Sequence, residues 1–427
     1  MGSVKYLIQD NSKAGKLYHP PQQNEFGLGA WQVTGNFSVK DLKEKIPESV
    51  IKYKPEALAM TNAAFFEYIA ENQPQIRTCY VGLLDPDGKI VDSQTLLKKG
   101  QTSSIVIMKL AHTPKSYSNG NLAQYRKALI SGELGCGVAD IESIFRKGLP
   151  LGSSIFAKIF ESVGLRKEYE KLTTYEEVVK GLDKIRATIQ QRTSDFSELE
   201  KILEKYKTGK DSEMILPNPG FILKKITYDS TTKFEESGDR DLTKEEEKKL
   251  SGLDYEGYEA WTKSIFPKIV EEQIEFTKER KILNVDGKCE CVSFRRKPVV
   301  TDFACTVDEN RLMVAFIHNC SVWAIPSNKE IQRAIFKQAG VDTAISEAKR
   351  RAENTGDINQ WKNYIPQVTT EMKIDLKAIA EHSCNLMSYA MAEVANRTLD
   401  EGLFDVPPLT SWINDFLLYA SKIEYQQ

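Results

Sequence analysis

Charged residues alternate along one short extended segment of the chain. Asp286, Lys288 and Glu290 occupy every second position of VDGKCE, with Val285 and Cys289 at the positions between. In a β-strand, residues two apart project from the same face, so these three charges share one surface. Taken alone, this pattern favours a solvated hairpin edge, and the next segment is what favours a functional site.

A second set of carboxylates follows the next apolar run. In PVVTDFACTVDENRL, Asp302 ends the run and Asp308 follows in the next turn. We expect residues 281–314 to form two antiparallel strands that line a cleft and bring Glu290 beside Asp302. Neighbouring carboxylates repel each other unless a cation lies between them, and Mg²⁺ takes carboxylate and phosphate oxygens. The segment therefore favours a magnesium site beside a phosphate-bearing ligand.

The bulk composition predicts a soluble cytoplasmic protein. The 427 residues exceed one typical core, and 58 Lys and Arg balance 60 Asp and Glu. This balance gives no reason to expect a nucleic acid or a membrane surface as a partner. We see no apolar run of about 18 residues and no signal-peptide pattern at the start. The seven cysteines form no C-x-x-C pair, and the four histidines show no metal-ligand spacing.

The periodicity of the chain predicts alternating β-rich and helical regions. Short β-type runs occur within residues 5–111, interrupted by a helix over 54–72 that begins with Pro55 in its first turn. Residues 121–215 have the pattern of charged helices, and PNPGF at 217–221 ends them. We expect helix over 243–280, a strand pair over 281–325 and helices over 327–427.

The motifs in order resemble those of the SAICAR synthetase (phosphoribosylaminoimidazole-succinocarboxamide synthase) family. The runs VDGKCE, DFACTVDENR and STTKFEESGDRD are similar to the consecutive family patterns V-D-x-K-x-E, D-E-x-x-T-P-D-x-x-R and T-P-x-T-K-x-E-x-x-H-D. AGKLYH, VTGNFSVKD, KPEALAMTNAAFFEYI and SNGNLAQYRKALISGELGCGV extend the resemblance over about residues 1–315. Each motif alone is weakly specific, but seven in the family order are specific.

The resemblance implies an α+β, SAICAR synthase-like two-lobed ATP-binding fold with added helical segments. Its expected parts are a β-rich nucleotide-binding lobe over 1–110, a central α+β lobe over 111–326 with a helical insertion at about 151–215, and a C-terminal helical region over 327–427. The family tends to assemble, so the resemblance also implies a homo-oligomer.

The activity implied is an ATP-dependent ligase that requires Mg²⁺ and joins L-aspartate to CAIR, a ribonucleotide of purine synthesis, to form SAICAR. Phosphorylation turns the CAIR carboxylate into an electrophile that the aspartate amine attacks, and such transfer needs positioning and charge neutralisation. By resemblance, Glu290 and Asp302 hold Mg²⁺, and Lys288 and Asp302 are catalytic. The remaining implied contacts are Lys16, Lys109 and Lys288 to the nucleotide, and Ser118, Asn119, Gly120, Lys233, Asp308 and Arg311 to the substrates.

The chain also departs from the family pattern, mainly on the substrate side. Phe303 replaces the family Glu, Val307 the Pro, and Gly238 the His. The arginine that precedes the family Thr-Gly-Ser loop has no counterpart, and Lys115 is the basic residue that could replace it. Two alternatives therefore stay open: an ATP- and Mg²⁺-dependent ligase or kinase that acts on a different substrate, and a non-catalytic binding relative.

Overall fold

The computed structural model describes residues 6–9, 13–36, 50–149, 153–172, 177–178, 180–185, 222–235, 240–319, 321–356, 358–407 and 421–423. Within them, helices and two antiparallel sheets are mixed, so the α+β prediction is confirmed. The part from 186 to 221, which holds the end of the expected insertion and PNPGF, lies outside the described residues. No helix in the described part is long and apolar enough to cross a membrane.

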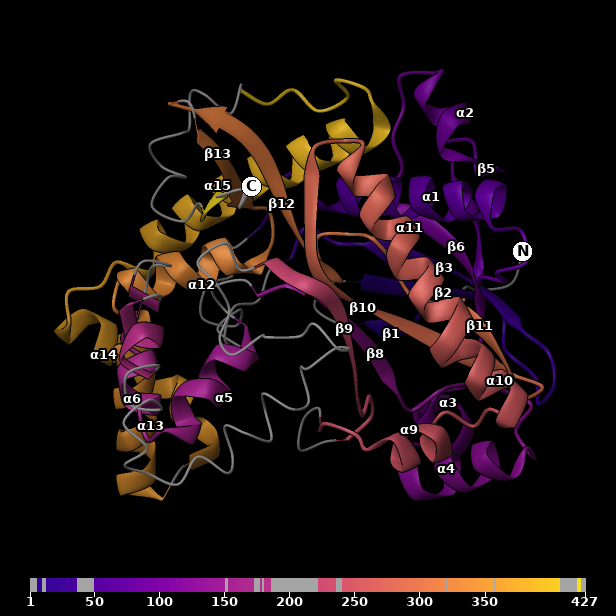
Figure 1. Cartoon of the computed structure of the whole chain (residues 1–427), viewed down its shortest axis with the longest axis horizontal. Coiled ribbons are helices and arrows are strands. Elements are labelled where there is room, and N and C mark those ends of the chain that lie inside the picture. The colour runs from indigo at the N-terminus through magenta and orange to yellow at the C-terminus, as the bar shows by residue number, and fades with distance from the viewer. Residues whose placement is uncertain are drawn as a thin grey trace.

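The first sheet has six strands in the order β1-β2-β3-β6-β4-β5 and lies on one side of the molecule (Figure 1). Helix α1 packs against it and begins with a proline in its first turn, where a missing N–H costs no hydrogen bond. The bounds of the elements are β1 Tyr6–Gln9, β2 Lys13–His19, β3 Gly27–Val33, α1 Lys54–Asn72, β4 Tyr80–Leu84, β5 Ile90–Val91, α2 Ser93–Leu97 and β6 Ile105–Leu110.

The second sheet is built on a central path of strands in the order β14-β13-β12-β10-β8-β9, with β7 and β11 also paired to β10. Its strands are β7 Cys136–Val138, β8 Glu142–Gly148, β9 Ile222–Thr231, β10 Ile282–Phe294, β11 Lys297–Thr301, β12 Asn310–His318, β13 Ser321–Pro326 and β14 Ser421–Ile423. The first half of β10 pairs with β8 and β12, and its second half pairs with β7 and β11. Strand β10 is therefore the axis of this sheet.

The remaining helices surround this sheet. They are α3 Pro114–Ser118, α4 Leu122–Ser131, α5 Ser154–Ser162, α6 Arg166–Tyr169, α9 Lys244–Leu250, α10 Tyr255–Ala260, the π-helix η2 Trp261–Ile265, α11 Phe266–Lys278, α12 Lys329–Gln338, α13 Val341–Thr355, the 3-10 helix η3 Ile358–Tyr364, α14 Ile365–Glu371 and α15 Leu376–Leu399. Helices α5, α6, α12, α13 and α14 lie on the side away from the first sheet (Figure 1).

Two sequence predictions of secondary structure were wrong. The region 121–215 was expected to be helical, but it contains β7 and β8. The segment 281–325 was expected to form one strand pair. The antiparallel hairpin β10–β11 is present, but β12 and β13 also fall within this segment, and β12 pairs antiparallel with β10.

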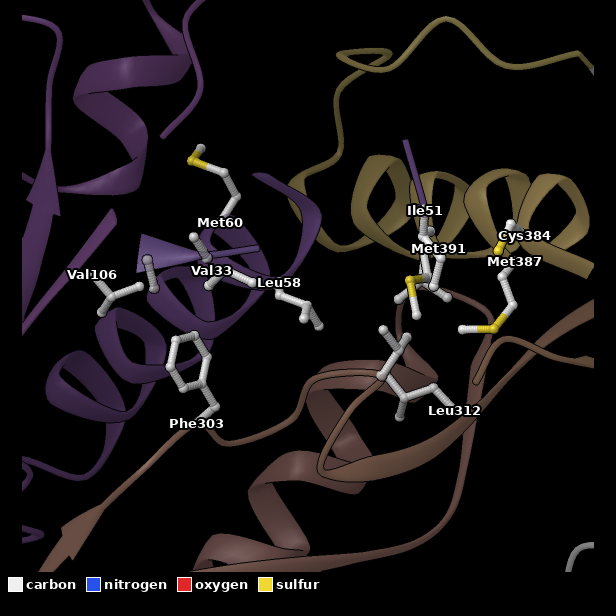
Figure 2. Packing of buried hydrophobic residues seen from close by; sticks show 14 of the residues in the cluster. Val33, Ile51, Leu58, Met60, Val106, Phe303, Leu312, Cys384, Met387 and Met391 are labelled. Carbon is white, nitrogen blue, oxygen red and sulfur yellow. The ribbon is translucent and has the colours of Figure 1, made fainter. Parts of the chain in front are cut away.

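The largest hydrophobic cluster joins the two sheets and the C-terminal helices. Leu58 and Met60 of α1 belong to the same buried cluster as Phe303, which follows β11, and Met387 and Met391 of α15 (Figure 2). Burying an aliphatic or aromatic side chain of this size is worth about 1.5 to 3 kcal/mol. The loop after β11 is therefore anchored in the main core.

Candidate functional site

The loop from 302 to 309 joins β11 to β12 and carries two of the predicted site carboxylates, Asp302 and Asp308. Glu290 lies opposite Thr301 in the β10–β11 register, so the next residue, Asp302, comes close to it. Asp302 (φ 61°) and Cys305 (φ 56°) both have left-handed backbone conformations. Such conformations cost energy for residues other than glycine, although Asp tolerates them better than most. The surrounding structure must therefore hold this loop in place.

Helix α1 supplies two contacts that hold the loop. The side-chain oxygen of Asn62 accepts a hydrogen bond from the backbone N–H of Ala304 at 3.0 Å. The ammonium of Lys54 lies 3.1 Å from Asp308 Oδ2, and the side chains are 2% and 7% exposed. Since α1 also packs on the first sheet, it fixes this loop relative to that sheet.

A first cavity of about 390 Å³ lies between the first sheet and the hairpin β10–β11. Its walls are mainly apolar, with Trp31 and Met108 from the first sheet and Phe234 from the segment after β9. At one side it is lined by Lys109, Lys233, Glu290 and Asp302. A mostly apolar cavity with a few polar groups at one side suits an aromatic base attached to a charged group.

Glu290 lies among several charged side chains at this cavity. It is 4% exposed, it forms an ion pair with Lys233, and its Oε1 lies 3.8 Å from the Lys288 ammonium. Burial raises the pKa of Glu290 to about 7, and repulsion from Asp302 adds to this, against the attraction of Lys233 and Lys288. Its Oε1 atom has no hydrogen-bond partner within the described residues. This oxygen is available to a cation or a donor.

The donor set at Glu290 and Asp302 fits a magnesium ion. Within the described ranges, no group of three or more His, Cys, Asp or Glu residues could enclose a metal ion by itself. Magnesium does not need such a group, because it usually binds one or two carboxylates and completes its shell with waters and substrate phosphates. The unpartnered Glu290 oxygen and the repulsion between the two carboxylates are what a bound cation would relieve.

The raised pKa of Glu290 predicts that the ligand-free protein loses stability as the pH rises. Between the ordinary value of 4.5 and the folded value of about 7, the folded state keeps a proton that the unfolded chain releases. This stabilisation is fully present below about pH 4.5 and is lost as the pH passes through 7. From pH 5 to pH 8 we expect a loss of about 2 to 3 kcal/mol relative to Glu290→Gln, measured by urea unfolding. A difference between the two proteins that stays constant with pH would contradict the raised pKa.

A second cavity, of about 600 Å³, is strongly polar. Its lining includes Glu142, Arg146, Asp286, Lys288, Asp308, Glu309, Arg311, Asn328, Glu330 and Arg333. Lys288 lies 2.5 Å from Glu142 and 3.1 Å from Glu309. Burial alone would lower the pKa of Lys288, but the carboxylates of Glu309, Glu290 and Glu142 outweigh it and raise the pKa. Lys288 therefore stays protonated, and its contact with Glu290 links the two cavities.

A row of alternating charges crosses the sheet beside this second cavity. Following the strands β9, β8, β10 and β12 to α12, its members are Asp229, Arg146, Asp286, Arg311, Glu330 and Arg333. The successive closest distances are 3.6, 3.4, 2.6, 3.1 and 2.6 Å. Asp286 lies opposite Arg146 on one side and opposite Arg311 on the other, so the strand register sets the order of charges. The row is neutral overall, which offsets the cost of burying it.

The structure divides the predicted site residues between the first cavity, the second cavity and positions outside both. Glu290, Asp302, Lys109 and Lys233 line the first cavity, whereas Lys288, Asp308 and Arg311 line the second. Arg311 lies in β12 and not in a turn, and its partners are Asp286 and Glu330. Lys16 lies in β2, where its backbone pairs with Ala30, but its side chain is outside the described part.

The predicted substrate loop is not part of either cavity. Ser118, Asn119 and Gly120 are absent from both linings. The Ser118 hydroxyl donates to the carbonyls of Pro114 and Asn121 and so closes the end of α3. The basic residue suggested as a replacement, Lys115, is exposed on the same helix.

Sequence reasoning missed several residues of the second cavity, notably Arg146, Asn328, Glu330 and Arg333. Glu142, Ile144 and Arg146 alternate as strand residues do, but the charged surroundings of β8 favoured a helix. The capping role of Asn328 could have been predicted, since Asn followed by a helical pattern is typical of an N-cap. Its place in the cavity follows only from the pairing of β12 with β13.

Fold and site together describe an α+β protein with two carboxylates between an apolar and a polar cavity. No family model matches the chain, and no curated protein is similar to it. Among solved structures, the chain is similar to SAICAR-synthase from Saccharomyces cerevisiae complexed with SAICAR. The identity is 12% and the TM-score 0.46, over 93% of this chain and 95% of that one.

Two further solved structures show the same similarity. A SAICAR synthetase in complex with ADP is 12% identical, with a TM-score of 0.42 over 86% of this chain and 98% of its own. The phosphoribosylaminoimidazole-succinocarboxamide synthase of Ehrlichia chaffeensis is 10% identical, with a TM-score of 0.41 over the same shares of each chain, 86% and 98%. The structure is therefore similar to those of SAICAR synthetases from several sources, at low sequence identity.

Proposed function

We propose that this chain is a divergent SAICAR synthetase, an ATP-dependent ligase that joins L-aspartate to CAIR in purine biosynthesis. The observation that carries the proposal is the position of Glu290 and Asp302. Both carboxylates line the apolar cavity, and Glu290 also contacts Lys288 of the polar cavity. ATP in the first cavity would present its γ-phosphate at this junction, and the second cavity would hold the acceptor.

The described side chains suit each step of this reaction. The apolar walls take the base of ATP, and Lys109 and Lys288 neutralise its phosphates. A Mg²⁺ ion held by Glu290 and Asp302 would neutralise the charge that develops as the γ-phosphoryl group moves. The CAIR carboxylate oxygen attacks that phosphorus and ADP leaves. The aspartate amine then attacks the acyl phosphate, loses a proton and expels inorganic phosphate, giving SAICAR.

The direct test is an assay of the purified protein with ATP, Mg²⁺, L-aspartate and CAIR. SAICAR and ADP should form in equal amounts, and omission of any one component should stop both. ADP formation that does not depend on CAIR or aspartate would contradict the proposed reaction.

A second candidate is an ATP- and Mg²⁺-dependent ligase or kinase that acts on a different acceptor. It is favoured by one observation, the absence of Ser118, Asn119 and Gly120 from both cavities. ADP formation with other carboxylate or hydroxyl acceptors, but not with CAIR, would select it. Absence of ATP binding would instead select a non-catalytic relative.

A further inference from the structure

The residue before α12 lines the polar cavity and has an unused hydrogen-bond donor. Asn328 is 3% exposed and lines the cavity. Its Oδ1 accepts a hydrogen bond from the backbone N–H of Glu330 at 2.9 Å, which caps the helix. Because this bond identifies the oxygen, the other atom of the amide is the NH₂ group. That Nδ2 has no hydrogen-bond partner within the described residues.

An unpaired buried donor of this kind is unusual. Leaving a buried polar group without a partner costs about 1 to 3 kcal/mol, so most such groups are satisfied. Asn328 keeps its cap through the oxygen alone, and the nitrogen contributes nothing to that cap. The donor is therefore accounted for if a ligand in the cavity accepts from it.

One turn later, the same helix adds a positive charge to the cavity. Glu330 Oε1 receives Arg311 Nε at 3.1 Å and Arg333 Nη1 at 2.6 Å, so one oxygen joins both guanidinium groups. Arg311 pairs with two carboxylates, whereas Arg333 pairs with Glu330 alone among the described side chains. The Arg333 side chain is 47% exposed. The row thus ends at the start of α12 with a guanidinium group that pairs with a single carboxylate.

The N-terminus of α12 adds a partial positive charge to that of Arg333. Helix α12 has 10 residues, and the N-terminus of a helix carries a partial positive charge with backbone N–H groups that favour anions. The free Nδ2 of Asn328, the Arg333 guanidinium and this helix end all favour the same kind of ligand. Each of them is a hydrogen-bond donor.

We propose that the start of α12 is an oxyanion subsite of the polar cavity, in which Asn328 and Arg333 bind a phosphate or carboxylate group of a substrate. The identity of that substrate rests on the proposed function. Two groups have the required chemistry, the phosphate of CAIR and a carboxylate of aspartate. It would supply from the C-terminal region the anion contacts that the loop at 118–120 does not provide.

The simpler interpretation is that Asn328 only caps α12 and that Arg333 only forms an i,i+3 ion pair with Glu330. Asn328→Asp separates the two interpretations. Asp caps a helix as well as Asn does, so a purely structural role is preserved. The variant loses the NH₂ donor and places a negative charge in the cavity, so an oxyanion should bind less tightly.

The experiment is calorimetric titration of wild type, Asn328→Asp and Arg333→Gln with CAIR, L-aspartate, inorganic phosphate and a non-hydrolysable ATP analogue, each separately. We expect both variants to weaken one of the first three ligands by about tenfold or more. The ATP analogue should bind as to wild type. The ligand that weakens identifies the source of the oxyanion.

Two matched variants control for structural effects. Asn121→Asp changes the residue that caps α4. The Asn121 side chain accepts a hydrogen bond from the Gln124 N–H at 3.0 Å and lines neither cavity. Arg350→Gln removes an i,i+3 pair with Glu347 on α13. Neither control should change any titration. If a site variant melts at a lower temperature than its control, the other site variant carries the test.

The outcomes separate the subsite from the proposed function. Wild-type affinity of both variants for CAIR, aspartate and phosphate overturns the subsite. If wild type binds neither CAIR nor aspartate, the proposed function fails, and inorganic phosphate still tests the subsite. Phosphate binding that is lost in both variants then supports it, and the absence of phosphate binding overturns it as well.

Discussion

Glu290→Gln and Asp302→Asn are each expected to lower ATP turnover by about 10²- to 10³-fold while the fold stays intact. Each change removes one negative charge from the junction of the two cavities and keeps the volume of the side chain. Preorganised charges at a reacting phosphate have effects of this size, and the proposed Mg²⁺ would lose one of its two protein ligands. The measurement is kcat at limiting and at saturating Mg²⁺, with a circular dichroism spectrum to check the fold.

The matched control for this prediction is Glu247→Gln. Glu247 is also buried, at 3% exposed, and pairs with Lys244 at 2.8 Å, but it lines neither cavity. Its replacement should leave turnover unchanged. If Glu290→Gln or Asp302→Asn keeps wild-type turnover at limiting Mg²⁺, the assignment of these two carboxylates to the metal is wrong.

Lys54→Met is expected to destabilise the protein by about 3 to 5 kcal/mol, because it leaves Asp308 buried without its ammonium partner. The two side chains are 2% and 7% exposed, so solvent screens this pair only weakly. The free energy of unfolding in urea measures the effect, and the double variant Lys54→Met with Asp308→Asn should recover a large part of it.

An exposed pair of the same chemistry provides the comparison. Lys158 lies 2.6 Å from Asp241, and their side chains are 37% and 49% exposed, so Lys158→Met should cost less than about 1 kcal/mol. Equal losses for the two methionine variants would show that burial does not strengthen the Lys54 pair. The hydrogen bond from Ala304 to Asn62 would then be the main contact by which α1 holds the 302–309 loop.

Local pattern predicted the elements whose residues interact over short distances along the chain. The helix at 54–72 has the bounds of α1, because Pro55 and the apolar spacing act within one helix. The alternation in β10 placed Lys288 and Glu290 on one face, where the ammonium and the carboxylate lie 3.8 Å apart. The predicted hairpin that brings Asp302 close to Glu290 is also present, because its two strands are joined by a short turn.

The contacts that the sequence pattern could not predict join separate segments of the chain. Asp286 meets Arg146, which is 140 residues earlier in the chain, and Arg311 meets Glu330 across two strands and a helix cap. Nothing in the sequence next to either residue identifies its partner. The contact between Lys54 and Asp308 likewise depends on how α1 packs against the loop after β11. Such pairings follow from strand order and helix packing, which a single sequence does not determine.

The left-handed backbone at Asp302 restricts which amino acids can replace it. Gly would fit this conformation without strain, Asn would fit it at least as well as Asp, and β-branched side chains would not fit. If no charge were needed at this position, Gly or Asn could replace Asp302 with no loss of backbone stability. The backbone conformation at 302 therefore does not require a carboxylate, and a carboxylate there repels Glu290. Among natural variants of this chain, we expect an acid at 302 to be present wherever Glu290 is, and both to be lost together.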